Sequence, residues 1–233
     1  MVRAAVADAV ALAERLEGRT PAATLQMSPP VLVIPQLFEP DFCRRLIAYW
    51  NDHDKLADMV STGDFRGGGQ IAEASLKRRL DTPITDVELT RAIAERMQRR
   101  AGPMIGKAFK TVANHFETFK IGCYDAANAG GFGRHWDDTA PKAAHRKLAM
   151  SVNLNTGEYE GGELVFPEFG RIRYAPPSGT AVVFSCSLLH EALPVTRGRR
   201  FGLFGFFFDD QGAAQVRQWI EADGGRIQVE QAR

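Results

Sequence analysis

The sequence predicts an α+β domain in which several helices precede a core of β-strands. Apolar residues recur at helical spacing before about residue 111, whereas after it short apolar runs alternate with turn residues. Helices followed by a run of strands are typical of α+β folds. With 233 residues, 45% of them hydrophobic, the chain is long enough to bury one main core.

Residues 2–17 predict an amphipathic helix that ends before Gly18. Residues 19–30 lack periodicity and predict a linker. We therefore expect an N-terminal helix and linker over residues 1–28 and the main domain over residues 29–233, with a β core at about 111–208. A helix outside the domain makes a homodimer a further expectation, and whether the chain is a fragment of a longer protein stays open.

The remaining N-terminal elements follow from local patterns. Residues 31–38 predict a strand, and Pro40 favours a helix over residues 39–51. Residues 58–70 are polar and glycine-rich, which predicts a loop that could close over a site. Periodicity predicts a helix over residues 86–109, bent or divided at Gly102-Pro103.

A cluster of three cations follows the glycine-rich segment. For Lys77, Arg78 and Arg79 the simpler interpretation is a solvated charge cluster. The alternative is that these side chains contact substrate beneath a closing loop.

Short strands are expected in the second half of the chain, separated by turn residues. They cover residues 112–124, 146–154, 162–166, 171–174, 180–184, 188–195 and 200–208. The last of them is rich in phenylalanine, which predicts a strand buried on both faces, with one ring beside a pocket.

Charge and cysteine content narrow the classes of function. Lys and Arg total 29 against 28 Asp and Glu, so no basic surface for nucleic acid or an anionic membrane is indicated. The three cysteines form no CxxC pair, which argues against a disulfide framework or a zinc knuckle and favours a reducing, cytoplasmic location. No apolar run approaches the roughly 20 residues of a membrane span.

His135-Trp136-Asp137 is the most informative motif, and His190 follows it after 52 intervening residues. On an extended segment His135 and Asp137 share one face, where both can reach one ion. Two histidines and a carboxylate can occupy one face of an octahedral Fe(II) and leave three positions open. Arg200, ten residues beyond His190, supplies a cation for the far carboxylate of a cosubstrate.

The stretch from about Phe116 to Phe208 resembles the prolyl 4-hydroxylase-like group of Fe(II)/2-oxoglutarate-dependent dioxygenases. The segments that carry the resemblance are Cys123-Tyr124, Arg134-His135-Trp136-Asp137, Leu154-Asn155, Gly161-Gly162-Glu163-Leu164-Val165-Phe166-Pro167, Pro177-Ser178-Gly179-Thr180-Ala181 and His190-Glu191-Ala192-Leu193-Pro194-Val195, followed by Gly198 and Arg200. The resemblance implies a double-stranded β-helix, or jelly-roll, core with flanking N-terminal helices.

The same resemblance implies roles for single residues. His135, Asp137 and His190 would be the iron ligands, and Arg200 would bind the distal carboxylate of 2-oxoglutarate where many relatives have lysine. Tyr124 would lie near the cosubstrate and Asn153 beside its carboxylate.

Neighbouring polar residues are expected to lie outside the site. Arg199 and Asp138 should face away from it, because strand neighbours point to opposite faces. His115 and His145 stand outside the matched positions.

The resemblance further implies an enzyme that uses Fe(II), 2-oxoglutarate and O2 to hydroxylate a C–H bond of an amino-acid, peptide or small-molecule substrate, releasing succinate and CO2. Ascorbate is a candidate additional cofactor. Two alternatives stay open: a non-catalytic jelly-roll module that binds a metal or ligand, and a cupin-type metalloenzyme that does not use 2-oxoglutarate. The substrate and the position and stereochemistry of oxidation are not indicated.

Overall fold

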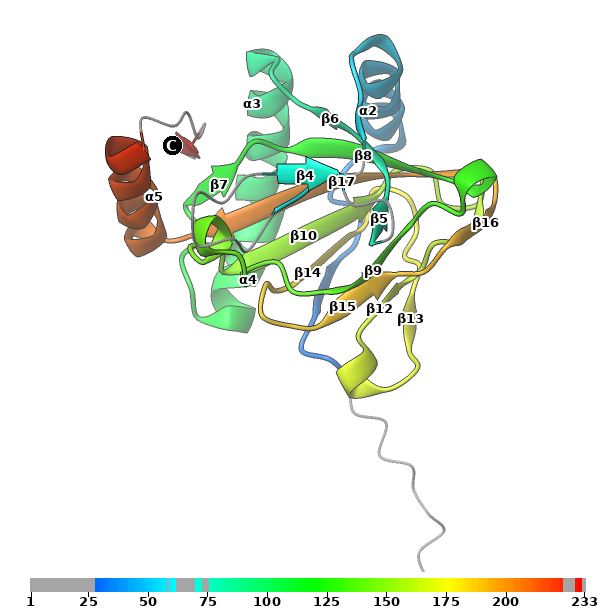
Figure 1. Ribbon diagram of the computed structural model, residues 1–233. Helices are drawn as coiled ribbons and strands as arrows, with labels where there is room; N and C mark the ends of the chain where they lie inside the picture. Colours follow the sequence, from blue (N-terminus) through cyan, green and yellow to red (C-terminus); the bar gives the residue numbers. More distant parts are fainter. Residues whose placement is uncertain (1–27, 58, 62–69, 73–75, 224–228, 232–233) are drawn as a thin grey trace, which may run out of the picture.

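In the computed structural model two antiparallel β-sheets face each other, and helices cover the outer face of the larger sheet (Figure 1). The structure describes residues 28–57, 59–61, 70–72, 76–223 and 229–231. The expected helix over residues 2–17, most of its linker, and residues 58 and 62–69 of the expected loop lie outside these ranges. No helix within them is long and apolar enough to cross a membrane.

The larger sheet has nine strands over the described residues. In spatial order they are β1 (Leu32–Ile34), β14 (Ala181–Ser185), β10 (Leu148–Asn153), β17 (Arg199–Phe208), β8 (Lys120–Asp125), β6 (Leu80–Pro83) and β2 (Leu56–Ala57), with β7 (His115–Glu117) beside β17 and β18 (Val229–Gln231) beside β7. The smaller sheet has the order β13 (Arg173–Tyr174), β12 (Leu164–Val165), β15 (His190–Ala192), β9 (Gly131–His135) and β5 (Lys77–Arg78).

Two short strand pairs and several helices complete the described elements. The pairs are β11 (Glu160–Gly161) with β16 (Val195–Arg197) and β3 (Met59–Ser61) with β4 (Gln70–Ala72). The longer helices are α2 (Pro40–Asp52), α3 (Val87–Arg96), a π-helical segment (Met97–Ala101), α4 (Gly102–Phe109) and α5 (Asp210–Asp223). Single 3-10 turns lie at Ala126–Asn128, Pro141–Ala143 and Pro167–Phe169.

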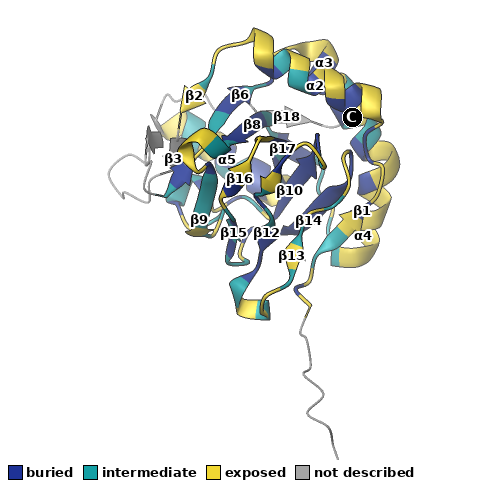
Figure 2. Ribbon diagram, turned by 90° about the vertical axis from the view of Figure 1, so that its right-hand side faces the viewer, coloured by how far each residue is buried: buried dark blue, intermediate teal, exposed yellow. Residues whose placement is uncertain are grey.

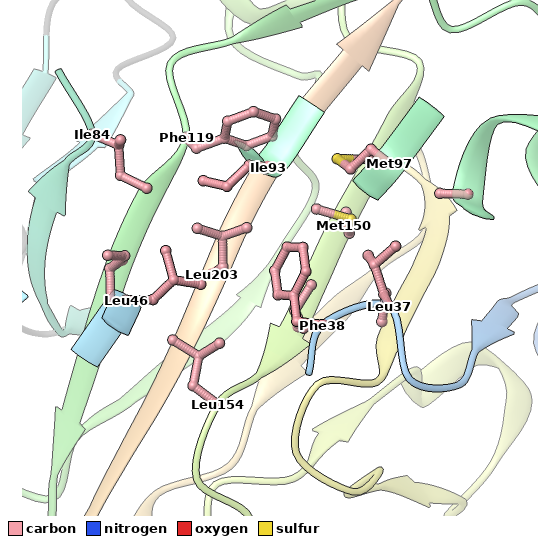
Figure 3. Packing of buried hydrophobic residues seen from close by; sticks show 14 of the residues in the cluster. Leu37, Phe38, Leu46, Ile84, Ile93, Met97, Phe119, Met150, Leu154 and Leu203 are labelled. Atoms are coloured by element: carbon pink, nitrogen blue, oxygen red, sulfur yellow. The ribbon is translucent and has the colours of Figure 1, made fainter. Parts of the chain in front are cut away.

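The main hydrophobic core lies between the larger sheet and helices α2, α3 and α4. Leu46 and Ile93 from two helices pack with Phe119, Met150 and Leu203 of the sheet side (Figure 3). Helix α3 begins where the Asp86 side chain accepts a hydrogen bond of 2.6 Å from the Leu89 backbone N–H. Because strand residues alternate between faces, the side chains on the opposite face of the same strands line the space between the two sheets.

Strand β17 illustrates this alternation. Phe201, Leu203 and Phe207 point into the helix-side core, whereas Arg200 and Phe204 line the space between the sheets. The central strands are buried along most of their length (Figure 2). The predicted burial of this strand on both faces is confirmed for most of its length, and Phe204 and Phe206 are the rings that lie beside a cavity.

Most expected elements are confirmed with shorter bounds. The predicted division at Gly102-Pro103 is confirmed, and the π-helical segment precedes it. The prediction of a loop over residues 58–70 was wrong in part, because Met59–Ser61 and Gln70–Ala72 form paired strands. Helix α5 was not predicted.

Candidate metal centre

The paired strands β9 and β15 bring the two histidines of the predicted site together, since His135 lies directly opposite His190. His135 Nε2 is 3.5 Å from Asp137 Oδ1, and His190 Nε2 is 3.3 Å from Asp137 Oδ2. One ligand atom from each of the three residues lies within 4.8 Å of the others. The Asp137 backbone N–H donates to the Cys186 carbonyl at 2.9 Å, which fixes the carboxylate beside the histidines.

Hydrogen bonds at the far side of each ring orient the histidines. His135 Nδ1 is 2.7 Å from the Gly133 carbonyl oxygen, and His190 Nδ1 is 2.9 Å from that of Leu188. A carbonyl only accepts, so each Nδ1 carries the proton and each Nε2 presents its lone pair to the site. The Phe132 ring stacks on His135 with centroids 3.5 Å apart and holds the ring in this plane. The donor set therefore fits a divalent metal with vacant positions, such as Fe(II).

The protonation states also suit metal binding, which needs neutral histidine and ionised carboxylate. Burial raises the pKa of Asp137, but His190 and His135 more than offset it, so the pKa lies below its ordinary value. Burial lowers the pKa of His190, and the neighbouring Asp137 only partly compensates. Both directions favour the states that bind a metal.

Arg200 lies on the inner face of β17 with 3% of its surface exposed. Its guanidinium donates to Asn153 Oδ1 at 2.8 and 3.2 Å and to Ser151 Oγ at 3.4 Å, and its Cζ is 5.2 Å from the Tyr124 ring centroid. None of the described ion pairs gives it a carboxylate. A buried cation costs free energy unless it is paired, so this position fits an anionic ligand.

The three candidate ligands and Arg200 line one narrow cavity of about 70 Å³. Tyr124, Phe204 and Phe206 also line it. Asn153 lies behind Arg200, with its amide nitrogen donating to the Pro176 carbonyl at 3.2 Å, and is not among the cavity-lining residues. Arg199 is exposed, with its Cζ 5.4 Å from the Phe201 ring on the opposite face, as alternation predicts.

The prediction that Lys77, Arg78 and Arg79 form a solvated cluster was wrong for two of them. Lys77 Nζ is 2.7 Å from Asp81 Oδ2, and the Arg79 guanidinium binds both Asp81 oxygens at 2.5 and 2.9 Å. The side chains of Lys77, Arg79 and Asp81 are 4%, 10% and 3% exposed, so the shared carboxylate compensates their burial. Their spacing of two residues, which suits one face of a strand, was the signal in the sequence.

Arg79 reaches the predicted site through the space above a glycine. A Cβ at Gly122 would lie 2.7 Å from Arg79 Cδ, so only glycine leaves room for this side chain. Arg79 Nη1 donates to the Tyr124 hydroxyl at 3.0 Å. Tyr124 accepts there, and its own O–H is left to donate into the cavity.

A second buried ion pair supports Asp137 from behind. Arg146 donates to both oxygens of Glu117 at 2.5 and 2.9 Å, and its Nη1 donates to the Asp137 carbonyl at 3.0 Å. His145 Nε2 is 3.0 Å from the same Glu117 carboxylate. His145 thus lies behind the site, as the sequence indicated.

The Glu117 pair makes stability depend on pH. Burial raises the Glu117 pKa, but Arg146 and His145 lower it from 4.5 to about 2. A lowered folded-state pKa contributes stability above the unfolded value, and that contribution is lost as pH falls from about 4.5 towards 2. We expect the unfolding free-energy difference between wild type and Glu117→Gln to shrink by about 2 kcal/mol between pH 6 and pH 3. Urea unfolding at both pH values measures it, and a constant difference would contradict the pairing.

Comparison with known proteins adds an independent result. Residues 119–208 match the model of the 2OG-Fe(II) oxygenase superfamily. The chain is 31% identical over 186 residues to PKHD-type hydroxylase Pfl01_0799 of Pseudomonas fluorescens, covering 75% of this chain and 76% of the relative. It is 28% identical over 156 residues to PKHD-type hydroxylase Mmar10_1675 of Maricaulis maris, covering 66% and 70%.

Among solved structures the fold is similar to a prolyl hydroxylase from Trichoplax adhaerens in complex with a peptide fragment of the hypoxia inducible factor oxygen degradation domain. The TM-score is 0.59 at 14% identity, covering 81% of this chain and 87% of that one. At this identity the likeness concerns the fold alone.

Proposed function

The chain belongs to the 2OG-Fe(II) oxygenase superfamily and is a hydroxylase of its prolyl 4-hydroxylase-like group, and on that premise we propose which residues hold its iron and its cosubstrate. His135, Asp137 and His190 bind Fe(II), and Arg200 binds the distal carboxylate of 2-oxoglutarate. The observation that carries the proposal is the cavity in which three convergent metal donors share walls with a buried arginine that has no carboxylate partner among the described residues.

Fe(II) and 2-oxoglutarate, when bound, supply the reaction in which dioxygen converts a substrate C–H bond to C–OH while 2-oxoglutarate is released as succinate and CO2. The chain contributes two neutral imidazoles and one carboxylate as ligands, already oriented by the Gly133 and Leu188 carbonyls. Arg200 offers a planar fork that suits a carboxylate. Phe204 and Phe206 give the cavity an apolar wall that would help to exclude water.

The same geometry supports roles for Tyr124 and Asn153. We propose that Tyr124 donates its hydroxyl proton to the bound cosubstrate, because Arg79 already occupies the oxygen as an acceptor. Asn153 positions Arg200 through the hydrogen bonds that its Oδ1 accepts and does not itself touch the cosubstrate. The two facing sheets would form the double-stranded β-helix that the sequence indicates.

The substrate is a C–H-containing amino acid, peptide or small molecule. The peptide complex of the Trichoplax prolyl hydroxylase supports a peptide as one form of it. The use of ascorbate, a cytoplasmic location and a homodimer stay predictions from the sequence.

Succinate formation tests the proposed function. Purified protein supplied with Fe(II), 2-oxoglutarate and air is expected to convert the cosubstrate to succinate, even without a substrate, and to stop when a chelator removes the metal. Succinate and bound iron are measured in the same samples. Iron-loaded protein that forms no succinate would overturn the proposal and favour a metal-binding module without oxidation.

A further inference from the structure

A second and larger cavity, of about 290 Å³, adjoins the candidate metal centre and offers a place for the substrate. His135 and Asp137 line both cavities, as do Arg79 and Phe204. A volume near 300 Å³ is at the small end of ligand sites, which suits a molecule of about amino-acid size. The inference drawn from it rests on the proposed function.

One of the cations that line this cavity has no carboxylate partner among the described residues. Five cationic residues line it, namely Lys77, Arg79, Lys120, Arg134 and Arg146. Asp81 is the shared partner of Lys77 and Arg79, and Glu117 is the partner of Arg146. Arg134 lies 3.5 Å from Glu191, which leaves Lys120 as the cation of this wall without a carboxylate partner among the described ion pairs. Excess positive charge in a low-dielectric pocket attracts an anionic ligand.

Lys120 is the cation whose position fits a ligand best. It lies on β8 opposite Phe204 and shares the inner face of the sheet with Tyr124, about 13 Å away at strand spacing. Among the described residues, no hydrogen bond or ion pair holds its ammonium group. Burial lowers the Lys120 pKa, and Asp81 and Glu117 only partly offset this. A half-buried ammonium without a close partner is unfavourable in the free protein, and a bound anion would relieve that cost.

We propose that Lys120 binds a carboxylate of the substrate, so that this hydroxylase acts on a small carboxylic acid of about amino-acid size. The carboxylate at Lys120 fixes one end of the molecule at the wall of the larger cavity. The rest of the molecule extends towards His135 and Asp137, which line the same cavity. The neighbouring cations Arg79 and Arg146 disfavour a positively charged group on the ligand. An acylated, neutral amino group therefore fits better than a free, protonated one.

Matched ligand pairs test the proposal with the iron- and 2-oxoglutarate-loaded protein. The probes are N-acetyl-L-amino acids and their primary amides, which differ in charge but hardly in shape. A second arm compares N-acetyl-aspartate amide with N-acetyl-asparagine amide, which places the carboxylate on a side chain, as in a peptide. Binding is measured by calorimetry without oxygen, and KM and kcat are measured by succinate formation in air.

Variants separate a ligand contact from a structural role. Wild type is expected to bind at least one acid of the first arm about tenfold or more tightly than its amide, as a hydrogen bond between charged groups implies. Lys120→Met should lose this preference with unchanged substrate-free succinate formation, and Lys120→Arg should keep it. Lys147→Met removes the same charge from an exposed position outside the cavity and should match wild type.

The possible results separate a failure of the Lys120 role from a failure of the proposed dioxygenase function. Equal binding of acids and amides, binding of no acid, or an acid preference that survives in Lys120→Met would overturn the role of Lys120. If only the second arm shows a preference for the carboxylate, the substrate would be a peptide with an acidic side chain and not a free carboxylic acid, which would overturn the proposed substrate class. Absence of succinate from iron-loaded wild type would instead overturn the proposed function. If Lys120→Met does not fold, Lys120→Arg and the ligand pairs still decide.

Discussion

Asp137→Ala is expected to abolish succinate formation, lowering the rate by at least about 100-fold. Among the described residues, the substitution removes the one carboxylate of the candidate metal centre, whose oxygens lie 3.5 and 3.3 Å from the two histidine Nε2 atoms. Loss of a residue that merely supports a ligand costs 10- to 100-fold in metal affinity or activity, so the loss of a ligand costs more. Iron content after dialysis and succinate formation at saturating Fe(II) are measured together.

Asp138→Ala is the matched control for this experiment. It removes the adjacent carboxylate, which accepts a hydrogen bond from the Ser187 hydroxyl and is not part of the candidate donor set. Its activity should stay within about twofold of wild type, as substitutions away from a site usually change little. Equal loss in both variants would point to local misfolding, and full activity in Asp137→Ala would remove this residue from the metal site.

Arg200→Met is expected to raise the KM for 2-oxoglutarate by about 100-fold, or about 2.7 kcal/mol. Methionine fills similar volume but offers no donor to the distal carboxylate. The direct measurement is the visible charge-transfer absorption of Fe(II) with 2-oxoglutarate in the absence of oxygen, titrated with the cosubstrate. Arg200→Lys should show an intermediate affinity, because an ammonium keeps the charge but lacks the planar fork.

Arg199→Met controls for the loss of positive charge on the same strand. Arg199 is exposed and its side chain lies on the helix side of the sheet, so its removal should leave the absorption titration unchanged. An unchanged titration in Arg200→Met would mean that another cation of the cavity binds the distal carboxylate of 2-oxoglutarate, and Arg79 would be the first to examine.

The sequence predicted the members of the candidate site better than their surroundings. His135 and Asp137 could be placed on one face because strand periodicity is local, and the distant His190 followed only from the order of the matched segments. Their convergence depends on the pairing of β9 with β15, which no local pattern reveals. The roles proposed for Tyr124 and Asn153 rest on hydrogen bonds from Arg79 and Arg200, which no local sequence pattern reveals.

Buried charge was the main feature that the sequence did not predict. Lys77 and Arg79 were expected to be solvated because a cluster of cations usually is. The compensating role of Asp81 becomes visible only when residues 77, 79 and 81 are placed on one face of a strand. Lys120 is the first residue of β8 and gave no separate signal. Helix α5 was missed although Ala213, Val216 and Ile220 follow helical spacing.

Strand β17 contributes side chains both to the main core and to the cavity, and this bears on how 2-oxoglutarate would bind. Leu203 packs in the main core while Arg200 faces the cavity, and the strand pairs with β8 over residues 199–204 and with β10 over residues 202–207. Backbone so placed opens to hydrogen exchange only when the whole domain unfolds. We therefore expect the proposed anchor for 2-oxoglutarate to be in place before the ligand binds, so that binding does not have to order this strand.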